Sequence, residues 1–251
     1  MTAVNPAITG GLRSFLYRRL ASWITCQINL LGRHPLLLDS KFQVNSLQDV
    51  FCHPFCWQVF DWLKAPPRLV VDLGAHCGHF SMLADLCFQT QFGRCEAEFL
   101  LVEPNPKLQR VIRRNLQRSG LCRHHAVHQG LVGGAKSGHG TLWVSPKNYL
   151  SAGTTAAPLS TPVQVDYLDL GTLVGQRRVD LLKIDIEGAE FEFVEAYPSL
   201  LARVDALVIE IHEASERVLQ RMLSSLRSLG LAPVCPPLVH GSAQLTRYQR
   251  M

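Results

Sequence analysis

The chain has 251 residues, of which 47% are hydrophobic and 18% are charged, so it carries enough apolar material for a large core and global disorder is excluded. Lys and Arg number 25 against 20 Asp and Glu, and the net charge of +5 is too mild to indicate a nucleic-acid binder. No stretch reaches the roughly twenty consecutive apolar residues of a membrane-spanning helix. We therefore expect one large α/β domain with an N-terminal extension and no stable membrane insertion.

The eight cysteines are scattered and lie mostly among apolar residues. A chain with this much core does not need disulfides, so we expect free thiols in a reducing cytoplasm. The tight cluster of Cys52, His53 and Cys56 has no second pair of ligands at a suitable spacing. We predict no metal there.

Residues 1–65 form the predicted N-terminal helical extension. Apolar residues recur every three or four positions up to Leu31, which predicts an amphipathic helix that includes the stretch 20–31. A loop at 32–35 and a second helix at 46–63 follow. We expect the first helix to pack on the domain, with a membrane-surface or dimerisation role as the alternative.

From residue 66 onward, strands alternate with helices. The predicted strands are 68–73, 97–102, 126–128, 141–144, 163–167, 179–185, 204–211, 231–234 and 245–248. The predicted helices are 79–86, 107–119, 168–173, 188–196 and 215–229, and residues 130–140 and 151–162 are predicted loops. This alternation indicates a mostly parallel sheet covered by helices on both faces, in which ligands bind beyond the carboxyl ends of the strands.

Four predicted strands end in polar or glycine-rich residues. Asp72, Gly74 and Gly78 form a D-x-G-x-x-x-G loop after the first buried strand. Gly74 permits a sharp turn and a close approach of ligand to backbone, and Gly78 permits close packing where the helix begins. Glu103 ends the next strand, where a carboxylate is well placed to accept both hydroxyls of a ribose, and Pro104 fixes the backbone after it.

The third and fourth strand ends carry charged residues. Lys183, Asp185 and Glu187 share one face if their strand extends that far. They are expected to be paired or to face a site, because a buried strand interior does not hold unpaired charges. Asp185 and Glu187 are candidates for binding a metal or taking a proton, and His212, at the end of the following strand, is a candidate base.

Four sequence blocks, VVDLGAHCGHFS, LLVEPNP, VDLLKIDIEGAE and VIEIH, together resemble the FkbM family of S-adenosylmethionine-dependent methyltransferases. The resemblance covers about 70–212. It implies a class I methyltransferase domain at 66–251: a Rossmann-like, three-layer α/β sandwich with a mostly parallel seven-stranded sheet whose last strand is antiparallel. Residues 1–65 lie outside it and are expected to form a lid that shapes the acceptor pocket.

The resemblance also implies where S-adenosylmethionine binds. Glu103 and Pro104 would lie at the ribose, Gln129 and Gly130 would flank the adenine, and Asp185 would lie close to the sulfonium. The first loop would line the methionine part with Asp72, Gly74, Ala75, His76 and Gly78.

Members of this family usually methylate a hydroxyl oxygen, often on a sugar or a secondary metabolite. We therefore expect a small-molecule acceptor, with His212 as base and with Asp185 or Glu187 orienting it or the acceptor. Lys183 either stabilises a developing oxyanion or pairs with Glu187, and the pairing is the preferred interpretation. A divalent metal held by Asp185, Glu187 and His212 is a less favoured alternative.

Other functions stay open at this point. Methylation of an amine nitrogen needs no strong base, and a cofactor-binding module without catalysis would use the same loops. The spacing of Gly74 and Gly78 is not the G-x-G-x-x-G of nicotinamide-dependent oxidoreductases. A homo-oligomer formed through the N-terminal helices is a further alternative, and no nucleic-acid partner is expected.

Overall fold

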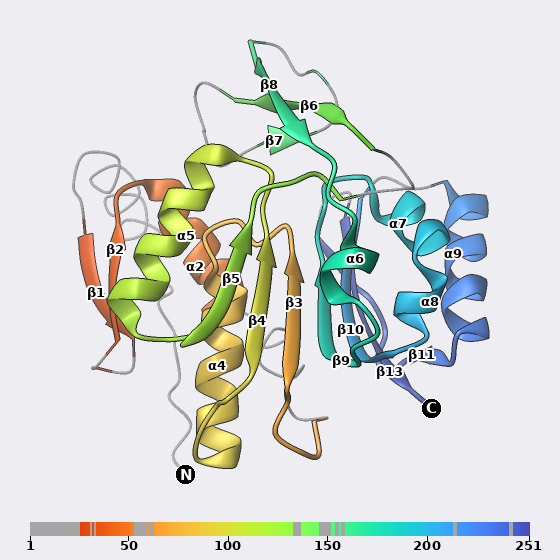
Figure 1. Cartoon of the computed structure of the whole chain (residues 1–251), viewed down its shortest axis with the longest axis horizontal. Coiled ribbons are helices and arrows are strands. Elements are labelled where there is room, and N and C mark those ends of the chain that lie inside the picture. Colours follow the sequence, from red (N-terminus) through yellow and green to blue (C-terminus); the bar gives the residue numbers. More distant parts are fainter. Residues whose placement is uncertain are drawn as a thin grey trace.

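The computed structural model describes residues 26–30, 32, 34–52, 60, 63–132, 137–145, 152–153, 156, 159–212, 215–240 and 243–251. The strands of its central sheet are β3 (Leu69–Leu73), β4 (Glu98–Val102), β5 (His124–His128), β9 (Val179–Ile184), β10 (Val204–Ile211), β11 (Leu231–Pro233), β12 (Leu238–His240) and β13 (Ala243–Arg250). Their order is β11-β13-β10-β9-β3-β4-β5, with β12 paired to β13 (Figure 1).

The five strands from β10 to β5 in this order are parallel, whereas β13 is antiparallel to β10. The predicted seven-stranded path with an antiparallel last strand is therefore confirmed, and β12 adds an eighth strand. The predicted strand 204–211 coincides with β10, and 245–248 lies inside β13.

Helices cover both faces of the sheet (Figure 1). The helices α2 (Lys41–Phe51), α4 (His79–Phe92) and α5 (Pro106–Ser119) pack on one face, and α6 (Leu170–Val174), α7 (Glu190–Ala196), α8 (Pro198–Leu201) and α9 (Glu216–Ser228) pack on the other. Side chains alternate along a strand, so β3 sends Val70 into the first core and Val71 and Leu73 into the second. The expected three-layer sandwich is confirmed.

The N-terminal region differs from the prediction. Residues 26–30 are not helical: β1 (Cys26–Leu30) and β2 (His34–Leu38) form an antiparallel hairpin. The sequence CQINL alternates apolar and polar residues, and Gly32 supplies a positive φ of 75° in the turn, so the two-residue period prevails over the helical spacing. Residues 1–25, including the rest of the predicted amphipathic helix, lie outside the described residues.

Helix α2 lies earlier in the chain than the helix predicted at 46–63. It begins after Ser40, whose side chain accepts a hydrogen bond from the backbone N–H of Gln43, and ends at Phe51. Residues 53–59 lie outside the described part, and Leu63 is not helical. The prediction is confirmed over 46–51.

A second, three-stranded antiparallel sheet stands beyond the ends of β4 and β5 (Figure 1). It consists of β6 (His139–Val144), β7 (Ala152–Gly153) and β8 (Thr161–Asp166), in the order β7-β6-β8. The predicted loops 130–140 and 151–162 were wrong at 139–140, at β7 and at the start of β8. Leu142, Val144 and Val165 give this sheet a small apolar core of its own.

Among the described residues, no helix has the length and apolarity to span a membrane. Six cysteine side chains are described and all are free, with Cys77 and Cys122 buried and Cys52 exposed.

Candidate active site

The loop after β3 is held against the end of β9. Gly74 has a φ of +71°, and a Cβ atom placed on it would lie 1.7 Å from the backbone oxygen of Asp185. The close approach that requires this glycine is therefore made by the neighbouring strand end, where the prediction had expected a ligand. The Nζ atom of Lys183 donates a hydrogen bond of 2.7 Å to the carbonyl of Gly74, which fixes the same junction.

A cavity of about 180 Å³ opens beyond the carboxyl ends of β3, β4 and β9. Of the predicted site residues, its wall contains Gly74, His76, Glu103, Pro104, Gly130, Asp185 and Glu187. Leu142, Ala152, Gly153 and Tyr167, from or next to the three-stranded sheet, line it too. The cavity therefore lies at the strand ends, where the sequence analysis expects the site, and Lys183 and His212 are not among the residues of its wall.

Three residues predicted to line the methionine part lie behind the wall. Ala75 and Gly78 are buried, and Gly78 starts α4 with a φ of +77°. Asp72 is 1% exposed and accepts a hydrogen bond of 2.7 Å from the hydroxyl of Ser81. These three residues shape the loop and do not border the cavity. Gln129 is exposed and also lies outside the cavity wall.

Glu103 is held rigidly at the end of β4. Its Oε2 accepts a hydrogen bond from the backbone N–H of His76 and its Oε1 accepts one from that of Asn105, both at 2.9 Å. The side chain is 6% exposed, and this burial raises the pKa of Glu103 to about 7. Because both carboxylate oxygens are held by backbone N–H groups, the remaining lone pairs of Glu103 point in a fixed direction.

Lys183 is held in place by ion pairs. Its Nζ lies 3.2 Å from Asp185 and 3.4 Å from Asp72, so these residues, and not Glu187, are its ion-pair partners. Burial favours the neutral amine, but the two carboxylates outweigh it and hold the pKa of Lys183 above its usual range. Strand β9 ends at Ile184, so Glu187 stands in a turn with a φ of 53° and does not continue a strand face.

His212 is oriented by a residue that the sequence analysis missed. Its Nδ1 lies 2.9 Å from Oε1 of Glu190, which is completely buried at the start of α7. Glu190 precedes the buried Phe193 and Val194 by three and four residues, so it belongs to the apolar face of the helix. A carboxylate on the apolar face of a helix indicates a buried polar partner, and this pattern in the sequence could have identified Glu190.

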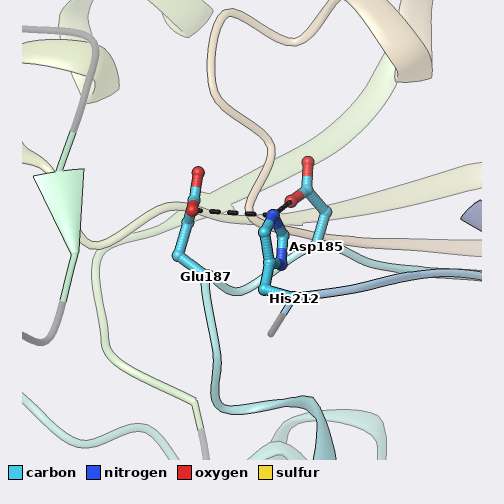
Figure 2. A group of neighbouring side chains, drawn as sticks. All are labelled: Asp185, Glu187 and His212. Atoms are coloured by element: carbon cyan, nitrogen blue, oxygen red, sulfur yellow. Dashed lines mark ion pairs between the residues drawn. The ribbon is translucent and has the colours of Figure 1, made fainter. Parts of the chain in front are cut away.

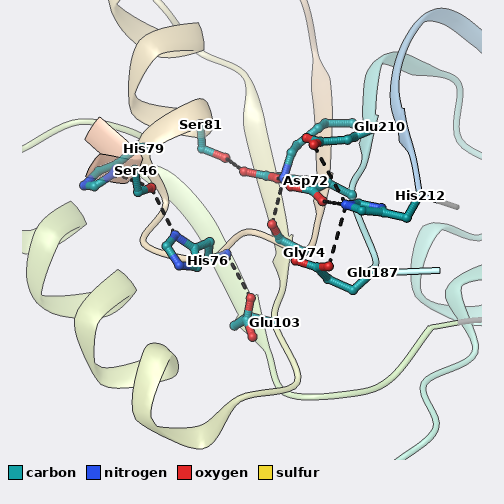
Figure 3. Close-up of polar contacts among 12 residues, drawn as sticks. Ser46, Asp72, Gly74, His76, His79, Ser81, Glu103, Glu187, Glu210 and His212 are labelled. Carbon is teal, nitrogen blue, oxygen red and sulfur yellow. Dashed lines mark hydrogen bonds and ion pairs between the residues drawn. The ribbon is translucent and has the colours of Figure 1, made fainter. Parts of the chain in front are cut away.

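The other ring nitrogen of His212 faces a group of carboxylates (Figures 2 and 3). Nε2 lies 3.6 Å from Glu187, 3.8 Å from Glu210 and 4.0 Å from Asp185. The hydrogen bond to Glu190 and the nearby carboxylates raise the pKa of His212 to about 9, against the effect of burial. Burial also raises the pKa of Glu187, and that of Glu210 to about 6.

The predicted metal alternative has a geometric basis. Candidate ligand atoms of Asp185, Glu187 and His212 all lie within 4.8 Å of one another. Carboxylate oxygens and an imidazole nitrogen suit several divalent cations. The same arrangement also suits a proton shared by the imidazole and its acidic neighbours.

Several solved structures are similar to this chain at low sequence identity. No curated protein matches the chain. Among solved structures it is similar to a putative RNA methyltransferase from Pyrococcus horikoshii, with 13% identity over 82% of each chain and a TM-score of 0.47. It is also similar to an O-methyltransferase family protein from Burkholderia thailandensis, with 13% identity over 84% of this chain and 56% of the other and a TM-score of 0.47. TrmK of M. capricolum, in complex with S-adenosyl-homocysteine, is 9% identical over 79% of this chain and 68% of the other, with a TM-score of 0.43.

A family comparison is more specific. The methyltransferase FkbM domain matches residues 72–231, which is more than half of the chain and includes the loop after β3, Glu103, the β9 end and His212. The chain therefore belongs to the FkbM family of S-adenosylmethionine-dependent methyltransferases.

Proposed function

We propose that this methyltransferase transfers a methyl group to a hydroxyl oxygen of a small molecule, such as a sugar or a secondary metabolite, with His212 as the base. The observation that carries the proposal is the pair formed by His212 and the buried Glu190, with 2.9 Å between Nδ1 and Oε1. A carboxylate that binds one ring nitrogen fixes the orientation of the imidazole and leaves the other nitrogen for proton transfer.

The cavity wall fits the cofactor of the family. Its acidic side chains are Glu103, Asp185, Glu187 and Glu192, and the described lining residues include no Lys or Arg, which suits a ligand with positive charge. Glu103 would accept hydrogen bonds from the ribose hydroxyls with Pro104 next to it, and Gly130 would lie beside the adenine. When bound, S-adenosylmethionine supplies a methyl group on positively charged sulfur.

The residues around His212 have one chemical task in this reaction. S-adenosylmethionine would supply the methyl carbon to the acceptor oxygen, and its sulfur would keep the electron pair of the carbon–sulfur bond. The hydroxyl proton moves to Nε2 of His212, while Glu190 keeps its hydrogen bond to Nδ1. Asp185 and Glu187 stabilise the imidazolium that results, because their oxygens lie 4.0 and 3.6 Å from Nε2.

The acidic wall also supports a small-molecule acceptor over a nucleic acid. Glu187 has a side chain that is 61% exposed, and Glu192 is exposed on the same wall. A phosphate backbone requires basic side chains at the entrance, and carboxylates repel it. This charge distribution supports an acceptor without phosphate groups.

Methylation of an amine is the second candidate, because two observations favour it. The acidic wall attracts an ammonium group, and a pKa of about 9 keeps most of His212 protonated at neutral pH. A protonated imidazole cannot act as a base, but an amine that has first lost its proton to water needs none.

The test is transfer of a labelled methyl group to a panel of hydroxyl compounds and amines, followed by identification of the methylated atom by NMR. We expect an O-methyl product, with turnover lost in His212→Ala and reduced in Glu190→Gln. An exposed histidine outside the site, His124, provides the matched control variant His124→Ala. An N-methyl product, or full turnover in His212→Ala, would refute the proposal.

A further inference from the structure

A second cavity, of about 480 Å³, lies between α9 and the end of the sheet that contains β13. The face of the sheet that lines it carries Ile211, Thr246 and Tyr248, and α9 contributes Leu219, Leu223 and Arg227, which lie on one face of the helix. None of its described lining residues belongs to the wall of the cavity at the ends of β3, β4 and β9. It is therefore a separate candidate site.

Most of the remaining wall of this second cavity is apolar. It is formed by residues 233–237, with the sequence PVCPP. Proline has no backbone N–H, so Pro233, Pro236 and Pro237 present carbon surface and no main-chain donor. Ligand sites are commonly cavities of about 300–1,000 Å³ with apolar walls and a few polar groups. The size and the wall of this cavity thus suit the apolar body of a small molecule.

The hydroxyl of Tyr248 is a buried donor that the described part of the chain does not satisfy. Tyr248 is completely buried, and its oxygen has no hydrogen-bond partner among the described residues. A buried tyrosine hydroxyl normally has such a partner. Burial raises the pKa of Tyr248 to about 12, so the hydroxyl keeps its proton at neutral pH. It can therefore donate a hydrogen bond to a ligand.

The surroundings of this hydroxyl place it on the side of the cavity. Besides burial, the groups that change the pKa of Tyr248 are Arg227 and Cys235, and both of them line the cavity. Arg227 is exposed and forms no ion pair with another described residue. The described lining residues include no Asp or Glu. The cavity thus combines one positive charge and one neutral donor with apolar walls.

This combination favours a carboxylate over a phosphate. The two oxygens of a carboxylate can accept one hydrogen bond from a guanidinium and one from a phenol. One arginine balances a single negative charge, whereas a phosphate dianion would keep a second charge unpaired beside apolar walls. The charge and the donors therefore indicate a monoanion.

We propose that this cavity binds a small carboxylic acid with an apolar body. Its carboxylate accepts hydrogen bonds from the Tyr248 hydroxyl and the Arg227 guanidinium, and its apolar part lies between α9 and residues 233–237. The proposal concerns a second site and depends on neither the methyl acceptor nor the base. Ile211, which lines the cavity, immediately precedes His212, so the two sites are neighbours along the chain.

The test is an NMR titration of the full chain with octanoate that carries ¹³C in its carboxyl group. We expect saturable binding that is about 5- to 20-fold weaker in Tyr248→Phe and about 3- to 10-fold weaker in Arg227→Gln. Arg217→Gln is the matched control, because Arg217 is exposed on the same helix and lies outside the cavity wall. Absence of binding, or equal affinity in wild type and Tyr248→Phe, would overturn the proposal.

Ligands of matched chain length test the recognition of the carboxylate. Octanol and octyl phosphate are both expected to bind at least about 5-fold more weakly than octanoate. An equal affinity for octanol would refute recognition of the charge. Tighter binding of octyl phosphate would refute the choice of a carboxylate.

The unfolding of the ligand-free protein tests the unsatisfied hydroxyl. Tyr248→Phe removes a buried donor that has no partner among the described residues, so its midpoint of urea unfolding should equal or exceed that of the wild type. A lower midpoint would mean that the hydroxyl is bonded within the protein, which contradicts the proposal.

Cys235 reports where the acid binds. It lines the cavity, and its Sγ accepts a hydrogen bond of 3.1 Å from Nε of Arg247. Octanoate should slow the alkylation of Cys235 by iodoacetamide and leave that of the exposed Cys52 unchanged, as measured by peptide mass spectrometry. Equal rates with and without octanoate would place the acid elsewhere and refute the site. Binding of S-adenosylmethionine, measured on the same variants, should stay unchanged, so a failure of the cofactor assignment is distinguishable from a failure of this proposal.

Discussion

Two polar groups near the cavity are held in different ways: the group at the ends of β3 and β4 contributes Glu103 and His76 to the cavity wall, whereas His212, at the end of β10, is not among the residues of that wall. On the β3–β4 side, Glu103 accepts two backbone hydrogen bonds of 2.9 Å, and His76 is joined to Ser46 at 3.0 Å. On the β9–β10 side, Nε2 of His212 has carboxylate oxygens at 3.6 to 4.0 Å, which is longer than a hydrogen bond. The first side is organised before a ligand arrives, whereas the second holds charges that a proton or cation can rearrange.

This difference corresponds to two separate functions, cofactor binding and proton transfer. Binding a cofactor in one pose requires donors and acceptors that are already oriented. Transferring a proton requires a group whose charge changes during the reaction. We therefore expect substitutions on the β3–β4 side to change affinity and substitutions on the β9–β10 side to change turnover.

The largest effect is expected where the two sides join. Gly74→Ala would place a Cβ atom 1.7 Å from the Asp185 oxygen at a φ of +71°, and should lower the free energy of unfolding by more than about 3 kcal/mol. Gly93→Ala is the matched control, because Gly93 has a φ of +80° and open space around it. It should cost about 1 kcal/mol. Urea unfolding measures both, and similar losses would contradict the importance of the strand junction.

His212→Ala tests the β9–β10 side alone. Loss of the base should lower kcat about 100- to 10,000-fold and leave the Kd for S-adenosylmethionine within about twofold. Steady-state kinetics and calorimetry on the same preparation separate the two quantities. A loss of affinity with unchanged kcat would remove the distinction between the sides.

Glu103→Ala is the converse test on the β3–β4 side. The ribose hydroxyls would lose the carboxylate that accepts their hydrogen bonds, which should weaken cofactor binding about 10- to 100-fold. At saturating cofactor, kcat should change much less. An unchanged Kd would mean that the carboxylate serves only the backbone N–H groups of His76 and Asn105.

The pH dependence of turnover sharpens the assignment of the base. A pKa of about 9 for His212 means that activity should rise with pH toward that value, because only the neutral ring accepts a proton. The hydrogen bond that Glu190 accepts from the ring favours the protonated form, so Glu190→Gln should move the rise in activity to lower pH, toward the ordinary pKa of 6.5. If activity rises over the same pH range in Glu190→Gln as in the wild type, a group other than His212 titrates.

The smallest effect is expected from a chelator. If Nε2 of His212 receives a proton, then EDTA should leave turnover unchanged and magnesium should not raise it. Loss of activity in EDTA that a divalent cation restores would assign Asp185, Glu187 and His212 to a metal.

The sequence predicted those parts of the fold that depend on local patterns. Buried strands such as 204–211, and the helix stop at Gly120 with its φ of +66°, follow from apolar runs and glycine chemistry. The β1–β2 hairpin was missed because Ile28 and Leu31 also suit a helical spacing. The predicted strands 141–144 and 163–167 were found within or overlapping β6 and β8, whereas β7 and the pairing of the three strands, which depends on contacts between distant residues, were not predicted.

The candidate site could also be predicted from the sequence only in part. Motifs predicted Glu103, Asp185 and His212 because they follow strands, and parallel strands end at one edge. Partners brought in by packing could not be predicted in this way. Ser46 reaches His76 from a separate helix, and Lys183 pairs with Asp72 because β3 and β9 are neighbours.

The position of β13 has a consequence for synthesis of the protein. It follows the other strands of the central sheet along the chain, yet it lies between β10 and β11 and contributes the wholly buried Tyr248. Until residue 250 has left the ribosome, the edge of β10 has no partner on that side and remains open to pairing with other chains. Efficient production of this enzyme should therefore depend on protection of an unfinished sheet during translation.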